Sequence, residues 1–394
     1  MKIRVPKLTL RFAVLYLGLS IYMLRTLLNA SSILFYNDIL DNVMFGISVI
    51  AFVAVAAMQR YDNKRILAVA AIAAFALLTG VLSGRPFLLL TILVCVAIKD
   101  IDFDKVVGFL FRITFVFMII HTVLSVAMPF LFERALLFVH TDGLRIRYAF
   151  GFIHPNSFSI FLFNLILMWV WLNYERIKYK HIVIIFITGV LAFIFSDTRT
   201  SFVLLIFLCM MLILDKWIPK FHLVLSFLAK GIVPVLSILV FIMIRLFLQG
   251  NLMVIIINSI LLNRIRLGAF AYYNWGLSLF GQNLQNVYVG WDPVSRRWTS
   301  LLIYDNIYSF FMVEIGIIWL IVVTVLFYFL ATKGSRRINL CIIIWAAYGM
   351  TEVHGWNGFI LFPFLFFTFF LGRNQGVIAQ INNSENSVLW NGRG

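Results

Sequence analysis

Residues 182–214 read IVIIFITGVLAFIFSDTRTSFVLLIFLCMMLIL, two apolar runs separated by the short polar segment 196–201. Runs of this composition are typical of helices that cross a membrane, each of which needs about 20 apolar residues. A polar break between two such helices is tolerated only where protein or water satisfies its backbone groups. The stretch therefore predicts two membrane helices, over 182–196 and 200–214, joined by a tight turn beside a cavity.

The rest of the chain has the same character. Of its 394 residues, 63% are hydrophobic and only 12% are charged, and the mean hydropathy is +1.00. A soluble globular protein is about half apolar and about a quarter charged, so this composition excludes one. The three cysteines lie far apart in apolar runs, which favours buried thiols over a disulfide or metal framework.

The predicted fold class is all-α, a polytopic transmembrane helix bundle with about 12 spans and short external interfacial helices. We expect one transmembrane domain over 1–371, with external loops over 133–155 and 248–302, and a disordered cytoplasmic tail over 372–394. The expected spans are 12–36, 43–58, 66–82, 86–98, 106–132, 156–173, 182–196, 200–214, 223–247, 303–331, 338–351 and 359–371.

The lysines indicate the orientation. They gather with arginines at the N-terminus and on alternate connections, which the positive-inside rule places in the cytoplasm. Both termini are therefore expected in the cytoplasm, in a multi-pass protein of the cytoplasmic (inner) membrane. The formal net charge of +16 is interpreted as a topological signal that faces anionic lipid, not as a nucleic-acid-binding surface.

The opposite connections contain arginine and no lysine. Their arginines are Arg85, Arg134, Arg145, Arg147, Arg199, Arg264, Arg266, Arg296 and Arg297, with Arg245 close to the same side. A guanidinium binds phosphate oxygens in a bidentate manner, so the set predicts an outward-facing anion site. Arg85 and Arg199 lie in very short connections, where each is expected to pair with an acid or to line a cavity. Asp197 is one such partner for Arg199.

Residues 304–308 (YDNIY) stand where a loop becomes a helix. Asp305 there has two open interpretations, an N-cap or a carboxylate that faces an external cavity and takes a proton from a sugar hydroxyl. Glu314 follows nine residues later, about half a turn round a helix, so the two acids do not share a face. Glu314 is expected in the interior of the bundle.

Residues 151–157 (GFIHPNS) predict the start of a helix at Pro155, with Asn156 or Ser157 as its cap. His154 is left without a structural role and is a candidate for orienting a hydroxyl or a phosphate. Arg145 and Arg147, just upstream, are expected to reach the same cavity.

Residues 263–266 (NRIR) lie in the long loop 248–302, whose apolar part is too short to span and predicts interfacial helices. On a helix Arg264 and Arg266 diverge by about 160°, so only one of them is expected to face substrate. The outward segments show no Asp-x-Asp pair and no His/Cys cluster, so we expect no metal and no other cofactor. A Gly-rich phosphate loop is also absent from the sequence, which argues against use of ATP.

Together these segments resemble the Wzy polysaccharide polymerase and O-antigen ligase group. The resemblance rests on Gly151 to Asn156, on Ser196 to Ser201, on Arg264 or Arg266 ahead of Phe280-Gly281, and on Asp305-Asn306-x-Tyr308 with Gly316; it covers about residues 140–320. It implies a transferase that uses polyprenyl-diphosphate-linked oligosaccharides as donor and acceptor at the outer face of the membrane. Membrane lipid and other polysaccharide-assembly membrane proteins are the further partners implied.

The resemblance also implies roles for single residues. In its ligase branch a histidine precedes the asparagine of the last motif and is the catalytic base, whereas Asp305 stands there in this chain, which favours a polymerase. Asp305 is thus the expected base. The expected substrate-binding residues are Arg199, Arg264, Arg266, Arg145, Arg147, His154, Asn156, Asn306 and Tyr308.

Two alternatives stay open. A ligase would transfer finished glycan to another acceptor. A flippase or other transporter of lipid-linked glycan should show internal pseudo-symmetry and polar sites on broken helices near the middle of the membrane. The sequence gives no sign of either feature.

Overall fold

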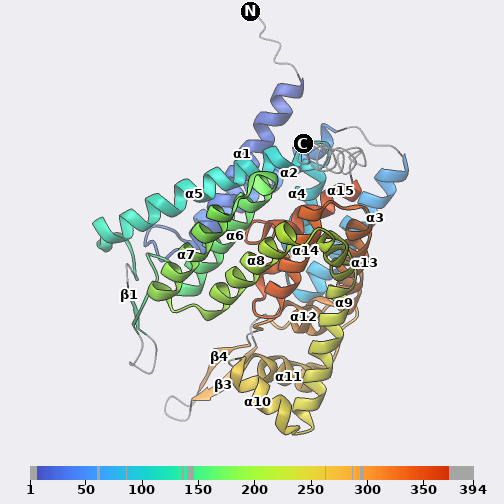
Figure 1. Cartoon of the computed structure of the whole chain (residues 1–394). Helices are drawn as coiled ribbons and strands as arrows, with labels where there is room; N and C mark the ends of the chain where they lie inside the picture. The colour runs from blue at the N-terminus through green and yellow to red at the C-terminus, as the bar shows by residue number, and fades with distance from the viewer. Residues whose placement is uncertain are drawn as a thin grey trace, which may run out of the picture. The chain divides into compact units, whose positions relative to one another are not determined.

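The computed structural model describes residues 7–59, 63–85, 87–134, 137–139, 146–261, 263–285, 287–292, 297–302 and 304–371 (Figure 1). Most of these residues are helical. The longer helices are α1 (Lys7–Asn29), α2 (Asp38–Ala57), α3 (Asn63–Ser83), α4 (Phe87–Ile98), α5 (Phe103–Ala127), α6 (Pro155–Asn173), α7 (Tyr179–Ser196), α8 (Arg199–Trp217), α9 (Phe221–Leu248), α10 (Leu252–Ile260), α11 (Arg264–Trp275), α13 (Ile317–Lys333) and α14 (Arg336–Gly349). The predicted tail over 372–394 lies outside the described residues.

Shorter elements complete the chain. Two antiparallel hairpins, β1–β2 (Leu137–Val139 and Ile146–Tyr148) and β3–β4 (Tyr288–Asp292 and Arg297–Leu301), lie in the two predicted external loops. The short helical pieces are η1 (Pro129–Leu131), η2 (Tyr174–Arg176), α12 (Ile307–Phe310), the π-helical turn η3 (Phe311–Ile315), η4 (His354–Trp356), η5 (Phe362–Phe367) and α15 (Thr368–Leu371).

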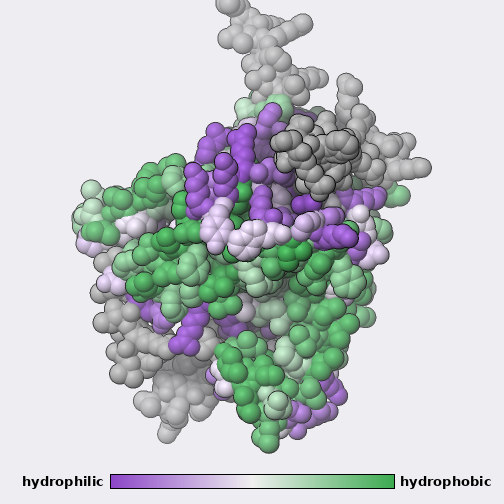
Figure 2. All heavy atoms as spheres, in the orientation of Figure 1, coloured by the Kyte–Doolittle hydropathy of each residue, from purple (hydrophilic) through white to green (hydrophobic). Residues whose placement is uncertain are grey.

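Eight helices of the described chain are long and apolar enough to cross a membrane. They are Leu10–Asn29, Asp38–Ala57, Ile66–Ser83, Phe103–Ala127, Pro155–Arg176, Tyr179–Ser196, Arg199–Trp217 and Phe221–Leu248. Their outer faces are apolar: Val203 is 60% exposed and Phe227 is 76% exposed. Figure 2 shows hydrophobic residues, in green, over most of the visible surface of α5, α7 and α9. The predicted class, a helical membrane protein with several spans, is confirmed, whereas the number of about 12 spans is not.

The chain forms two compact units from interleaved segments. Unit 1 comprises Met1–Arg65, Leu93–Pro219 and Thr368–Gly394, and unit 2 comprises Ile66–Ile92 and Lys220–Phe367. Helix α4 passes from unit 2 to unit 1 between Ile92 and Leu93. We expected a single transmembrane domain over 1–371. Whether both units form one such domain in a membrane stays a prediction.

In unit 1, α7 and α8 form the helical hairpin predicted from residues 182–214 (green to yellow-green in Figure 1). The turn between them is made possible by Asp197, which ends α7 in the left-handed conformation (φ 46°). Aspartate is one of the few residues other than glycine that adopt this conformation readily. Gly189 lets the two helices approach, since a Cβ on it would lie 3.1 Å from the Leu205 side chain.

In unit 2, the long helix α9 packs against α11, α13 and α14. Short helices were predicted in the loop 248–302, and α10 and α11 are such helices. The expected continuous span over 303–331 is wrong, because the helix begins at Ile307, passes through the π-helical turn and breaks at Gly316 (φ +116°). A Cβ on Gly316 would lie 2.5 Å from the carbonyl oxygen of Leu279.

The segment 278–282 accounts for this break. The backbone N–H of Ser278 donates to the carbonyl of Met312 (3.0 Å), and that of Gln282 donates to the carbonyl of Glu314 (2.9 Å). In return, the N–H of Ile317 donates to the carbonyl of Ser278 (2.8 Å). The backbone groups freed by the broken helix are thus satisfied by a segment about 35 residues earlier, as buried backbone groups require.

Candidate functional site

The loop before α12 carries Asp305 and Asn306. The Asn306 side-chain oxygen accepts a hydrogen bond from the backbone N–H of Ser309 (2.7 Å), and Asn306 is 4% exposed. Asn306 is therefore the N-cap of α12, and the capping interpretation of Asp305 is wrong. The Asp305 carboxylate is left for other contacts, and 36% of its side chain is exposed.

Arg264, the first residue of α11, lies between two carboxylates (we call Arg264, Asp305 and Glu352 the Arg264 cluster). Its Nε is 3.9 Å from Oδ2 of Asp305, and its Nη2 is 3.5 Å from Oε1 of Glu352. The side chains of Arg264 and Glu352 are only 11% and 12% exposed. One nearly buried cation therefore faces two acids, of which Asp305 alone is substantially open to the outside.

Burial shifts the protonation of both acids, which lie outside the eight candidate spans. Burial raises the pKa of the Asp305 carboxyl above its usual value, and Arg264 opposes this shift. Burial likewise raises the pKa of Glu352 to about 7; Arg264 lowers it and the nearby charge of Asp305 raises it further. Because burial disfavours the charged form of an acid, the cluster can hold or release a proton near neutral pH.

Glu352 was not singled out from the sequence. The signal was nevertheless present, because Glu352 is an isolated acid directly after the expected span 338–351. An ionisable residue beside a membrane-embedded segment is a functional candidate by default, since it is costly to keep there without a partner.

Arg264 and Arg266 point in different directions, as their spacing predicted. Arg264 is nearly buried in the cluster, whereas Arg266 is exposed. Tyr308, predicted to bind substrate, has no exposed surface, and its hydroxyl donates to the carbonyl of Ala346 (2.8 Å). The Asn306 side-chain oxygen is likewise engaged as a helix cap. Both Tyr308 and Asn306 therefore make hydrogen bonds within the fold at the positions predicted to bind substrate.

A second ion pair in unit 2 joins Arg85 and Glu314. Nε of Arg85 lies 2.6 Å from Oε1 of Glu314, and Glu314 is fully buried. The prediction that Arg85 pairs with an acid and the prediction that Glu314 lies in the interior are both confirmed. Glu314 sits in the π-helical turn next to the break at Gly316, so a charge pair accompanies the irregular backbone.

The motif residues of unit 1 gather at the α7–α8 turn. Nε of Arg147 donates to the carbonyl of Ser196 (2.8 Å), and Nη2 donates to the carbonyl of Asp197 (3.2 Å) and to the side-chain oxygen of Asn156 (3.1 Å). A cation on the last carbonyls of a helix is a stabilising C-terminal contact. Arg147 and Asn156 meet, as predicted, and these bonds make Arg147 a cap of α7.

The hydroxyl groups of this turn are linked as well. Ser159 of α6 lies 3.0 Å from the Ser196 hydroxyl oxygen and 2.6 Å from that of Thr198, and all three side chains are buried. The polar break predicted between the two spans is thus satisfied largely by protein groups.

His154 is the N-cap of α6, where its Nδ1 accepts a hydrogen bond from the backbone N–H of Asn156 (3.1 Å). The predicted helix start at Pro155 is confirmed, whereas the prediction of Asn156 or Ser157 as the cap is wrong, because an N-cap directly precedes the first helical residue and His154 stands there. Arg199 is the exposed first residue of α8 and makes no ion pair with Asp197. Arg145 lies outside the described residues.

The predicted site residues therefore fall into two groups. Arg147, His154, Asn156 and Arg199 belong to unit 1, and Arg264, Arg266, Asp305, Asn306 and Tyr308 belong to unit 2. A pocket with a volume of about 10 Å³, lined by Arg264, Asn306 and apolar side chains of α9, lies beside the Arg264 cluster. It has room for about one water molecule, so any larger molecule would have to approach the exposed side of Asp305.

An alternating run of acids, Asp100, Asp102 and Asp104, precedes and begins α5 in unit 1. Asp100 pairs with Lys99 (3.0 Å), Asp102 caps α5, and Asp104 accepts a hydrogen bond from Nε1 of Trp171 (2.8 Å). Within the described part of the chain, no three His, Cys, Asp or Glu side chains are grouped so that they could hold a metal ion.

No protein-family model, no curated protein and no solved structure matches the chain.

Proposed function

We propose that the chain is a membrane glycosyltransferase that polymerises lipid-diphosphate-linked oligosaccharide repeat units at the outer face of the cytoplasmic membrane. The Arg264 cluster is the observation that supports this function: Asp305 is partly exposed, beside a nearly buried arginine and a second acid. The confinement of lysine to alternate connections supports an outward orientation with both termini in the cytoplasm.

In the proposed reaction, a hydroxyl oxygen of the acceptor sugar attacks the anomeric carbon of the donor glycan. The bond from that carbon to the lipid diphosphate breaks, and its electron pair leaves with the diphosphate. The hydroxyl proton passes to the carboxylate of Asp305. Attack on the side opposite the leaving group inverts the anomeric configuration.

Arg264 has a defined part in this chemistry. Burial raises the pKa of Asp305 and so makes its carboxylate a stronger proton acceptor, while Arg264 keeps the carboxylate ionised until it is used. Glu352 holds the other side of the same guanidinium. Arg264 is therefore occupied by two acids, which leaves the exposed Arg266 on the same helix as the better group for the diphosphate.

The test uses the full chain in proteoliposomes supplied with labelled lipid-linked repeat units. Asp305→Asn should leave single repeat units, with chain growth reduced by at least about 10²-fold, as expected for loss of a general base. Asp38→Asn is the matched control, because Asp38 is exposed at the start of α2 and makes the same chemical change elsewhere. Asp38→Asn should give the normal ladder of products. A normal ladder from Asp305→Asn would overturn the proposal.

A second candidate, a transporter of the lipid-linked glycan, is favoured by one specific observation. A transporter was expected to show a broken helix, which the sequence did not reveal. The structure contains one at Gly316, beside the ion pair between Arg85 and the buried Glu314. The same proteoliposomes distinguish the two functions. Movement of lipid-linked glycan across the bilayer without any longer product would favour the transporter.

A further inference from the structure

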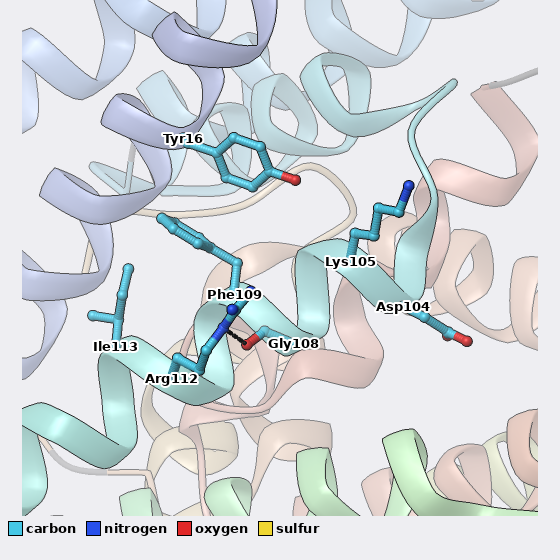
Figure 3. Close-up of a pocket in the computed structure, with 7 residues that line it drawn as sticks. All are labelled: Tyr16, Asp104, Lys105, Gly108, Phe109, Arg112 and Ile113. Atoms are coloured by element: carbon cyan, nitrogen blue, oxygen red, sulfur yellow. Dashed lines mark hydrogen bonds between the residues drawn. The ribbon is translucent and has the colours of Figure 1, made fainter.

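A groove on unit 1 lies apart from every residue discussed as a reaction site. It runs between α1 and α5, has a volume of about 880 Å³, and is lined by Tyr16 and by one face of α5 from Asp104 to Ile113 (Figure 3). Ligand sites usually measure about 300–1,000 Å³, so the groove has the size of a binding site and is far larger than a free phosphate needs.

Arg112 is unusual for its position on α5. The helix is a candidate membrane span that begins at Phe103, and Arg112 lies nine residues further, about 13 Å along the axis. Arg112 is exposed, and its Nε donates a hydrogen bond to the carbonyl of Gly108, one turn earlier on the same helix (3.1 Å). Among the described residues it makes no ion pair. A cation at this depth of a span is costly unless it meets an anion or reaches the membrane surface.

The orientation of the Arg112 side chain along α5 indicates where such an anion would lie. Side chains on a helix lean toward its N-terminus, and the bond to Gly108 draws Arg112 back by one turn. Lys105 is exposed on the same face, two turns before Arg112. Gly108 stands between them and has no side chain to fill the space. The two cations therefore converge on the level of the lipid headgroups.

The other lining residues suit a lipid. The rings of Tyr16 and Phe109 pack with their centroids 4.6 Å apart and form an apolar wall that continues to Ile113. Figure 3 shows the Tyr16 hydroxyl directed toward the side of Lys105. The acid of the lining, Asp104, accepts a hydrogen bond from Trp171 (2.8 Å), and its carboxylate points away from Tyr16 and Phe109 in Figure 3. The groove thus combines two cations with an apolar wall.

We propose that this groove binds an anionic glycerophospholipid, with its phosphate between Lys105 and Arg112 and an acyl chain along Phe109 and Ile113. The charge of the groove and its place on a membrane-crossing helix select this occupant, because anionic lipid is attracted by clustered Lys and Arg at a membrane surface. The site is independent of the reaction proposed at Asp305.

The test is native mass spectrometry of the full chain in detergent, titrated with phosphatidylglycerol or with phosphatidylcholine. The chain should retain phosphatidylglycerol in preference to phosphatidylcholine. The double variant Lys105→Gln/Arg112→Gln should bind phosphatidylglycerol on the order of tenfold more weakly, since each cation contributes to attraction of anionic lipid. Lys105→Gln alone should show a smaller loss in the same direction.

The matched control is Arg176→Gln/Lys180→Gln, which removes one exposed arginine at the end of η2 and one exposed lysine in the first turn of α7. It should bind phosphatidylglycerol as the parent chain does. Equal binding by the parent and the groove variants, or equal retention of both lipids, would overturn the proposal. Displacement of phosphatidylglycerol by millimolar inorganic phosphate would also overturn it, because the site would then be one for free phosphate.

Discussion

Two arginines that were expected to bind substrate, Arg264 in unit 2 and Arg147 in unit 1, face different acceptors. Arg147 donates to two backbone carbonyls and an amide oxygen, at 2.8–3.2 Å. Arg264 faces two carboxylates at 3.5 and 3.9 Å, one of them partly exposed. Neutral acceptors at hydrogen-bond distance hold a turn in place. The carboxylates that face Arg264 are titratable and lie slightly further from it, so they can exchange protons and move toward a ligand.

The comparison shows that residue type alone does not tell which of the two arginines holds the fold together and which lies beside groups that can exchange protons. Both arginines lie in the region, about residues 140–320, that the resemblance covers, and both were expected to bind substrate. The acceptors named above differ in charge and exposure, and most of them belong to residues distant in sequence. The comparison predicts that the two arginines respond differently to the same substitution.

Arg264→Gln should have the largest effect on stability. It leaves the nearly buried Glu352 and the partly exposed Asp305 without their cation, and loss of one partner from a buried pair costs about 3–5 kcal/mol. We expect a lower thermal midpoint in detergent and loss of chain growth in the folded fraction. A thermal midpoint equal to that of the parent chain would show that the Arg264 cluster does not stabilise the fold. The expected difference in stability between the Arg264 and Arg147 variants would then be absent.

The pH dependence of stability should follow Glu352. Its folded pKa of about 7 is raised above the usual value, so the folded chain binds the proton more tightly than the unfolded chain. The stabilisation is therefore fully present below the unfolded pKa of about 4.3 and is lost as the pH rises through the folded pKa, by on the order of 3–4 kcal/mol in total.

Thermal unfolding between pH 5 and pH 8 checks this expectation. The parent chain should have a lower midpoint at pH 8 than at pH 5, and Glu352→Gln should remove most of that difference. A pH dependence unchanged in Glu352→Gln would assign the proton to another group.

Arg147→Gln should have a smaller effect. It removes hydrogen bonds to neutral acceptors, each with a net value of about 0.5–1.5 kcal/mol, so we expect a loss of about 1–2 kcal/mol. Because Arg147 caps α7, chain growth by the folded fraction should persist. Loss of chain growth with an unchanged thermal midpoint would instead give Arg147 a direct role in substrate binding.

The sequence predicted what is local. The α7–α8 hairpin follows from two apolar runs and the polar segment between them, and the divergence of Arg264 and Arg266 follows from helix geometry alone. The break at Gly316 could not be predicted, since it depends on hydrogen bonds to segment 278–282. The contact between Arg264 and Glu352 joins residues 88 positions apart, and no local pattern specifies it.

The caps show the same limit on a smaller scale. Asp305 and Asn306 are adjacent and both suit an N-cap, and only the start of α12 at Ile307 decides between them. His154 was left without a structural role in the sequence and was therefore a candidate for orienting a hydroxyl or a phosphate. Its Nδ1 nevertheless accepts a hydrogen bond from the backbone N–H of Asn156, so His154 fills the capping role that was expected of Asn156 or Ser157.

The most direct test of the central claim, that Asp305 is the base of a glycosyl transfer, compares Asp305→Glu with Asp305→Asn in a single-turnover assay. The assay measures formation of the first glycosidic bond between two lipid-linked repeat units by the full chain in proteoliposomes. Asp305→Glu keeps a carboxylate near Arg264 and should retain a measurable rate, whereas Asp305→Asn should fall at least about 10²-fold below the parent. Equal rates for the two variants, or a parent-like rate for Asp305→Asn, would contradict the claim.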